Sequence, residues 1–200
     1  MRWTLPNVIT VSRVPMMFAV VGLMIADFNP AATLAFWLFI VAALSDWLDG
    51  LIARKSGQVS QFGRFMDAVI DKVMVLGLMV ALLQGGYFGE LTLIALMAWL
   101  CILTREFAIS GLRMIAAVKG LVVEADKSGK VKTFTQLNAI GWLMGARMLS
   151  DDFGDLFPGD DMMIIRVVHI VGLCFYFLSA LLTVTSGWNY LRRHAHVFAD

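Results

Sequence analysis

The stretch that decides the fold runs from Asp46 to Asp71 and reads DWLDGLIARKSGQVSQFGRFMDAVID. Apolar sequence flanks its charged residues on both sides, from Ala31 to Leu44 and from Val73 to Leu83. Ionisable groups beside membrane-grade apolar segments are costly, so the carboxylates of this stretch are candidates for function.

Four aspartates in this stretch form two pairs. Asp46 and Asp49 are three residues apart and Asp67 and Asp71 are four apart, so each pair projects from one face of a helix. The polar turn Lys55–Phe62 predicts that the two helices are antiparallel neighbours, whose acidic faces can then meet. Four carboxylates at close range repel one another unless a cation holds them. Oxygen ligands alone select a hard cation such as Mg²⁺ or Mn²⁺.

Small and cationic residues accompany the first pair. Gly50 and Ala53 leave room for a bulky group against the helix, and Arg54 supplies a forked cation suited to phosphate. Together with a metal cluster they suggest a site for a nucleotide pyrophosphate. The alternative is a pair of buried ion-pair networks, for which the stretch contains few basic partners.

Composition places the chain in a membrane. Of its 200 residues 60% are hydrophobic and 16% charged, against about 45–50% and 25% in an ordinary soluble domain. The net charge of +1 gives no bulk attraction to nucleic acid. Cys101 and Cys174 lie in apolar segments without metal-site spacing, so we expect two small buried hydrophobic side chains.

The expected fold is an all-α integral membrane protein, one catalytic domain over residues 1–200. Segments of about 20 apolar residues mark six transmembrane helices. They are expected near Val8–Asp27, Ala31–Ala53, Phe65–Gln84, Leu91–Ala117, Val131–Leu149 and Ile164–Tyr190.

Charge alternates between the connections. Lys and Arg gather at both ends of the chain, in the turn that follows Arg54 and in the loop 119–132, whereas the other side carries the acidic cluster 151–161, which we interpret as solvated. The positive-inside rule therefore predicts that both termini and the aspartate stretch are cytoplasmic. A helix rises about 22 Å from Ala31 to Asp46, which places the aspartates below the cytoplasmic surface, where lipid headgroups meet water.

Three further segments carry polar residues toward the same face. Asn7 and Thr10, with Arg13, share a helical stripe behind Pro6, a stripe that could equally be an interfacial anchor with a snorkelling arginine. The segment TREFAISGLR, residues 104–113, brings Arg105 to the depth of Asp46. It is either a pocket for an anionic acceptor or a buried ion pair with Glu106.

The third segment is the basic run KSGKVKT, residues 127–133. Such a loop is commonly a topology signal or a contact with anionic lipid. Beside Arg105 and Arg113, it also supplies phosphate-binding charge at the same membrane face.

The spacing of the aspartate stretch resembles the signature of the CDP-alcohol phosphotransferase family, D-x2-D-G-x2-A-R-x8-G-x3-D-x3-D, with every fixed position present. The resemblance implies that Asp46, Asp49, Asp67 and Asp71 bind divalent metal, two ions of Mg²⁺ or Mn²⁺, and that Asp71 is also the catalytic base. It further implies a homodimer in the cell (inner) membrane. The implied donor is CDP-diacylglycerol, and the residues expected to bind it are Asn7, Thr10, Gly50, Ala53, Arg54, Ser60 and Gly63.

The segments 104–113 and 127–133 look like those of the family branch that uses glycerol 3-phosphate as acceptor and makes phosphatidylglycerophosphate. The implied acceptor-phosphate ligands are Thr104, Arg105, Arg113, Lys130 and Lys132. The expected reaction is direct transfer of the phosphatidyl group to glycerol 3-phosphate with release of CMP. Two alternatives stay open: another acceptor (inositol phosphate, inositol or serine), and a divalent-cation transporter that uses the intramembrane carboxylates.

Overall fold

A computed structural model describes residues 5–56, 61–121, 128–156 and 162–198. Within these ranges the side chains of 5–7, 46–56, 61, 62, 64, 128–130, 196 and 198 are outside the description.

Six long helices make up the fold, and no strand occurs in the described ranges. They are α1 (Leu5–Ile25), α2 (Ala31–Ser56), α3 (Gln61–Gln84), α4 (Thr92–Val118), α5 (Ser128–Asp151) and α6 (Met162–Arg193). Short 3₁₀ turns follow α3, α5 and α6, at η1 (Gly89–Leu91), η2 (Gly154–Leu156) and η4 (Ala195–Phe198). The six predicted helices are confirmed within a few residues. The predicted turn Lys55–Phe62 is shorter than expected, because both of its ends are helical.

The chain is an all-α integral membrane protein. In the described residues, three segments are long and apolar enough to cross a bilayer: Val8–Ile25, Gly89–Val118 and Met162–Arg193. The apolar part of α2, Ala31–Ser45, is shorter. Large apolar side chains also cover the outside, such as Val118 at 88% exposure and Phe107 at 68%, as a lipid-facing surface requires.

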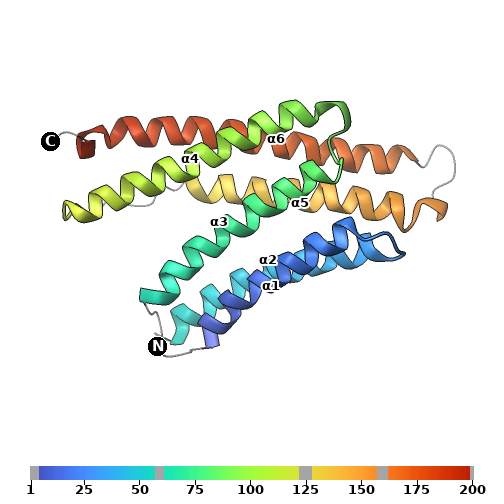
Figure 1. The fold of residues 1–200 in the computed structure, drawn as a ribbon, viewed down its shortest axis with the longest axis horizontal. Coiled ribbons are helices and arrows are strands. Elements are labelled where there is room, and N and C mark those ends of the chain that lie inside the picture. Colours follow the sequence, from blue (N-terminus) through green and yellow to red (C-terminus); the bar gives the residue numbers. More distant parts are fainter. Residues whose placement is uncertain (1–4, 57–60, 122–127, 157–161, 199–200) are drawn as a thin grey trace.

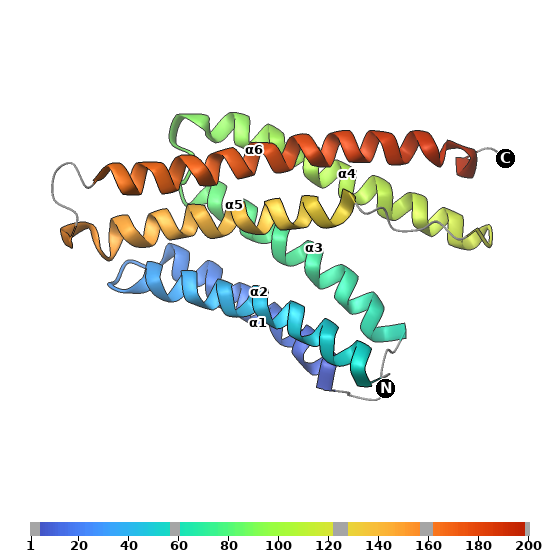
Figure 2. The ribbon, with the colours of Figure 1, turned by 180° about the vertical axis from the view of Figure 1, so that it is seen from behind.

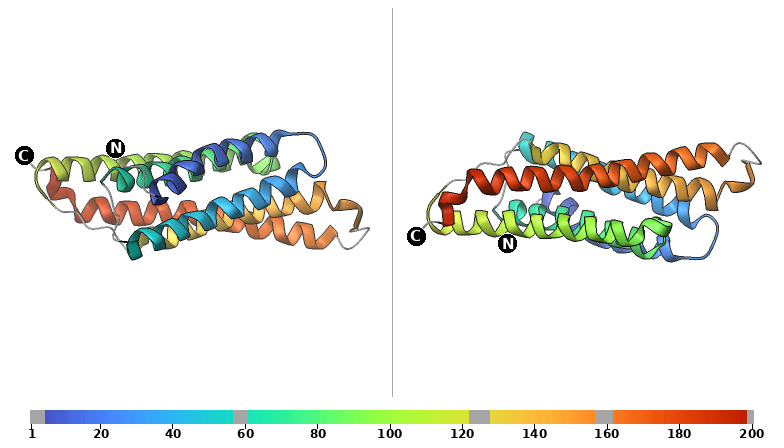
Figure 3. Two further views of the ribbon diagram at one scale, coloured as in Figure 1. Left: turned by 90° about the horizontal axis from the view of Figure 1, so that it is seen from below. Right: turned by 90° about the horizontal axis from the view of Figure 1, so that it is seen from above.

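The helices form an elongated bundle along one long axis (Figures 1 and 3). α5 and α6 pack along each other, and α1 packs on both α2 and α3. α3 crosses the bundle obliquely from the end that holds the start of α1 toward α4 (Figure 2). In the described residues α2 and α3 both pack on α1. The predicted direct contact between α2 and α3 near their turn involves side chains outside the described residues and stays a prediction.

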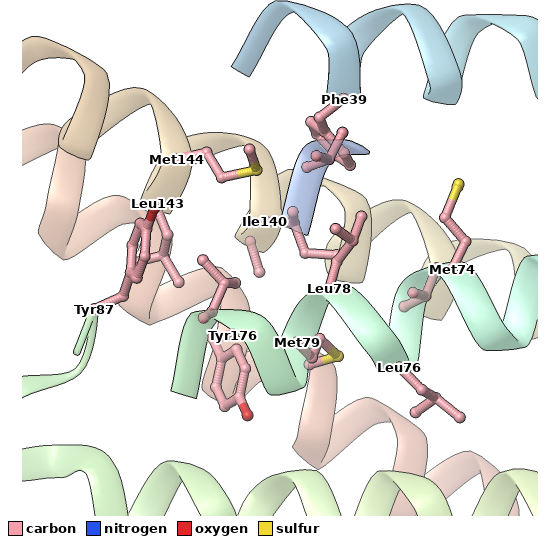
Figure 4. Close-up of a cluster of buried hydrophobic side chains, with 14 of the residues drawn as sticks. Phe39, Met74, Leu76, Leu78, Met79, Tyr87, Ile140, Leu143, Met144 and Tyr176 are labelled. Carbon is pink, nitrogen blue, oxygen red and sulfur yellow. The ribbon is translucent and has the colours of Figure 1, made fainter. Parts of the chain in front are cut away.

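The bundle has an apolar half, at the end of the α1–α2 and α3–α4 connections. Its core joins residues from all six helices, and Figure 4 shows many of them facing one another. Met79, Leu82 and Ile140 are fully buried there. A Cβ built on Gly172 of α6 would lie 2.8 Å from Leu143 Cγ, so this glycine allows the close α5–α6 contact.

Two expectations about single residues are wrong. Cys101 and Cys174 are exposed on the apolar surface rather than buried, because lipid accepts a small apolar side chain as readily as a core does. Asp152, expected to be solvated with the rest of its cluster, accepts a 2.6 Å hydrogen bond from the backbone N–H of Thr33. It thereby satisfies one of the unpaired N–H groups at the start of α2.

Candidate active site

The opposite half of the bundle, which we call the polar half, contains Arg13, Asp67, Asp71, Lys72, Glu106 and Lys132. In each helix these residues lie toward the end that carries the starts of α1, α3 and α5 and the ends of α2, α4 and α6 (Figure 1). Two groups of side chains make up its chemistry. One joins α1 to α3, and the other joins α4 to α5 and α6.

The first group is built on Arg13 of α1, whose side chain is fully buried. Its Nη1 donates a 2.6 Å hydrogen bond to Asp71 Oδ1, and its Nη2 donates a 2.8 Å bond to Asp67 Oδ1. One guanidinium therefore binds both carboxylates of α3, which shows that the i,i+4 pair faces one side of the helix. Thr10, one turn earlier on α1, is buried on the same stripe.

Arg13 is not the snorkelling anchor that the sequence left open, since no part of its side chain reaches the surface. The two carboxylates remain 48% and 42% exposed, so they face both the arginine and an accessible space. A cation already holds two of the four aspartates together here, as the repulsion between them demands.

Two carboxylates of the kind that a hard divalent ion prefers lie together on α3, and within the described residues no three metal-ligating side chains come together. Asp67 and Asp71 present carboxylate oxygens on one face of α3, at positions accessible to a divalent cation. Asp46 and Asp49 lie in α2, but their side chains are outside the described residues. The meeting of all four carboxylates stays a prediction.

The second group is built on Glu106 of α4, which is 7% exposed. Its Oε1 accepts a 3.0 Å hydrogen bond from Arg105 Nη1 and a short one from Lys132 Nζ of α5. Glu106 therefore pairs with an arginine and with a lysine, which is the buried ion pair that the sequence offered beside an acceptor pocket. A buried carboxylate thus holds two of the predicted acceptor-phosphate ligands at one point.

Arg105 lies against α6 because α6 carries a glycine at the point of contact. A Cβ on Gly187 would lie 2.5 Å from Arg105 Cγ. Arg105 Nη2 also donates a 3.3 Å hydrogen bond to Ser186 Oγ. Gly187 and Ser186 therefore fix the course of the arginine side chain toward Glu106.

Lys72 connects the two groups. It follows Asp71 on α3, and its Nζ donates a short hydrogen bond to Ser110 Oγ of α4. Ser110 Oγ in turn donates a 2.7 Å bond to the carbonyl oxygen of Glu106. One turn of α3 thus faces the carboxylate group with Asp71 and the cationic group with Lys72.

The other predicted ligands are more scattered. Arg113 is exposed at the end of α4, where its Nε donates a 3.1 Å hydrogen bond to Tyr190 Oη. Thr104 is exposed on the outer face of α4, and Gly63 is half-buried at the start of α3. Ser60 is outside the described residues. The remaining predicted ligands lie in helices, at positions whose side chains are not described: Asn7, Gly50, Ala53, Arg54 and Lys130.

Sequence reasoning missed four residues of the polar half as parts of the site: Lys72, Ser110, Ser186 and Gly187. A lysine directly after Asp71 in an otherwise apolar run was an available signal, since an ionisable group there is costly without a role. The glycine and the two serines carry no such signal. Their contacts depend on which helices lie side by side.

Comparison with known proteins supplies the family. The family model for CDP-alcohol phosphatidyltransferase matches residues 3–185. A protein of Bacillus subtilis (strain 168), named CDP-diacylglycerol–glycerol-3-phosphate 3-phosphatidyltransferase, is 32% identical over 96% of this chain and 95% of its own length. Proteins of the same name from Rickettsia typhi and Shigella flexneri serotype 5b are 31% and 32% identical, over 94% and 96% of this chain and 95% and 94% of their own lengths. The chain belongs to the CDP-alcohol phosphatidyltransferase family.

Proposed function

We propose that this protein transfers the phosphatidyl group from CDP-diacylglycerol to glycerol 3-phosphate, giving phosphatidylglycerophosphate and CMP in phospholipid biosynthesis. Relatives that match nearly the whole chain carry this activity in their names. The structural observation that carries the proposal is the pairing, across one turn of α3, of accessible carboxylates with a buried cationic cluster. Carboxylates suit a metal-bound pyrophosphate, and clustered cations suit a phosphorylated acceptor.

Two divalent ions per site, Mg²⁺ or Mn²⁺, would be held by Asp46, Asp49, Asp67 and Asp71. When bound, they would neutralise the pyrophosphate of the donor and the charge that develops on CMP. We assign the donor nucleotide to the face of α2 that carries Gly50 and Ala53, with Arg54, Ser60 and Gly63 nearby in the sequence and with Asn7 and Thr10 of α1.

Asp71 accepts the proton of the C1 hydroxyl of glycerol 3-phosphate. That oxygen forms a bond to the lipid-side phosphorus, and the bond from this phosphorus to the pyrophosphate bridging oxygen breaks as CMP leaves. Arg105 and Lys132, with Lys130 and Arg113, bind the acceptor's phosphate group, and the outward-facing Thr104 is left out of this set. Positioning and electrostatic stabilisation carry the rate, as in other phosphoryl transfers.

The proposed topology follows the charge pattern, with six spans, both termini in the cytoplasm and the polar half toward the inner leaflet of the cell membrane. α2, α3 and α5 span the bilayer although they carry polar residues; on α3 and α5, Asp67, Asp71 and Lys132 pair with charged residues of other helices. We also propose that two copies of the chain form a homodimer.

Product analysis with candidate acceptors tests the function. Purified protein, CDP-diacylglycerol and Mg²⁺ are incubated with glycerol 3-phosphate, inositol phosphate, inositol or serine, and CMP release is measured. We expect release with glycerol 3-phosphate far above that with the neutral alcohols. Equal release with serine or inositol would overturn the choice of acceptor, and Mg²⁺ uptake into sealed vesicles without CMP release would support a transporter instead.

The stereochemistry at phosphorus tests the direct transfer. A donor that is chiral at the lipid-side phosphorus should give a product of inverted configuration, because a single in-line displacement inverts it. Retention would indicate a covalent enzyme intermediate and would contradict the proposed step.

A further inference from the structure

Lys72 occupies a position that the family resemblance and the proposed ligand set leave without a role. It is half-buried on α3, directly after Asp71, and its Nζ reaches Ser110 of α4. Consecutive residues of a helix point in directions about 100° apart. Asp71 therefore faces Arg13 of α1 while Lys72 faces the cationic group on α4.

Lys72 adds a third positive charge to that group. Its charge acts electrostatically on both Glu106 and Lys132, as does that of Arg105. Three cations, Lys72, Arg105 and Lys132, thus act on one carboxylate, which leaves this group with an excess of two positive charges. Such an excess inside a helical bundle is costly unless an anion completes it.

Hydrogen-bond donors are in excess at the same place. Arg105 Nε and Gln136 Nε2 are buried and have no acceptor among the described residues. Gln136 is 3% exposed and lies one turn from Lys132 on α5. Buried donors without acceptors cost free energy, and an oxyanion would satisfy them. Charge and hydrogen bonding therefore call for the same kind of ligand, one that brings several oxygens and about two negative charges.

We infer that Lys72 binds the phosphate group of the acceptor and makes the site specific for phosphorylated over neutral alcohols. This inference rests on the proposed function and adds Lys72, with Gln136 as a supporting donor, to the acceptor site. A phosphate monoester carries about −1.5 to −2 charge at neutral pH and matches the excess of the cluster. Because Lys72 is next to Asp71, the residue that binds the acceptor's phosphate and the residue that accepts its hydroxyl proton lie on the same turn of α3.

The test compares full-length wild-type protein with Lys72→Met in detergent micelles that contain CDP-diacylglycerol. We expect the KM for glycerol 3-phosphate to rise about tenfold or more, with the KM for the donor within about twofold. The preference for glycerol 3-phosphate over glycerol should fall by a similar factor. Lys119→Met, which removes an exposed lysine directly after α4, is the matched control and should leave both KM values unchanged. An unchanged KM for glycerol 3-phosphate, or an equal rise for the donor, would overturn the inference.

A binding measurement keeps the inference separate from the reaction. In the absence of donor, inorganic phosphate and glycerol 3-phosphate should raise the melting temperature of the wild-type protein, whereas glycerol should not. Lys72→Met should lose most of this response, and Lys72→Arg, which preserves charge where Met impairs folding, should retain part of it. A response of Lys72→Met and Lys72→Arg equal to wild type would contradict the role of Lys72. A wild-type protein that responds to phosphate but transfers nothing to glycerol 3-phosphate would instead refute the proposed function.

Discussion

The apolar and polar halves of the bundle use the same helices for different purposes. In the apolar half, side chains such as Leu82 and Ile140 fill a core, and the buried hydroxyl of Tyr176 donates a 3.0 Å hydrogen bond to the backbone carbonyl of Ala95. In the polar half, buried charges bind oppositely charged side chains of other helices: Arg13 of α1 binds Asp71 of α3, and Glu106 of α4 binds Lys132 of α5. Because charges are costly in a bilayer, we infer that the apolar half provides stability and that the polar half carries the chemistry.

Asp71→Asn should have the largest effect on activity. The substitution keeps the size of the side chain but removes the base and one charge of the ion-binding set, so turnover should fall at least about a hundredfold. Binding of CDP-diacylglycerol should stay largely intact, which equilibrium binding of the donor measures. Asp151→Asn in the exposed cluster at the opposite end is the control and should keep full activity. Substantial turnover by Asp71→Asn would remove the proposed base.

A pair of glycine substitutions on α6 compares the two halves directly. Gly187→Ala should push Arg105 from its course toward Glu106 and raise the KM for glycerol 3-phosphate about tenfold, since Cβ and Cγ would otherwise lie 2.5 Å apart. Gly172→Ala creates a similar conflict with Leu143, so it should lower the melting temperature and leave KM unchanged. If both variants raise the KM, or both change only the melting temperature, the assignment of binding to the polar half and of stability to the apolar half is wrong.

Arg13→Gln tests whether one guanidinium stabilises two carboxylates. Without the guanidinium, Asp67 and Asp71 repel each other, and we expect the free energy of unfolding to fall by about 1–3 kcal/mol, since both acids are partly solvated. Melting in detergent with EDTA measures this loss. Mg²⁺ should raise the melting temperature of the variant more than that of the wild type, because it replaces the missing charge. Equal melting of both proteins in EDTA would contradict the ion pair's role.

Arg113→Ala should have the smallest effect of the series. Arg113 is exposed and lies against Tyr190, about two turns from Arg105, so it can contribute charge near the mouth of the acceptor site. The KM for glycerol 3-phosphate should rise a few-fold and the KM for CDP-diacylglycerol should change less. Steady-state kinetics with each substrate varied in turn decides this. A larger rise for the donor would move Arg113 out of the acceptor site.

The spacing of residues along the sequence predicted the features that depend on a single helix. The six helices follow from apolar runs, and the common face of Asp67 and Asp71 follows from their four-residue separation, which the two bonds from Arg13 show. What spacing does not contain is the order and rotation of the helices. The position of α1 between α2 and α3, and the direction of Lys72 toward Ser110, arise only when the bundle is packed.

The cost of burying charge offered a partial guide beyond spacing. Arg13 and Lys72 each stand out in apolar sequence, and both have carboxylate or hydroxyl partners on other helices. Cys101 and Cys174 show the limit of such reasoning, since lipid and core accept the same small side chains.

Transfer of labelled glycerol 3-phosphate into lipid is the direct test of the proposed activity. Purified protein is incubated with CDP-diacylglycerol, Mg²⁺ and the labelled acceptor, and labelled phosphatidylglycerophosphate and CMP are quantified together. We expect equal amounts of both products, with no transfer after EDTA treatment or in Asp71→Asn. Label that stays in the aqueous phase while the protein is folded and supplied with Mg²⁺ would contradict the proposed activity.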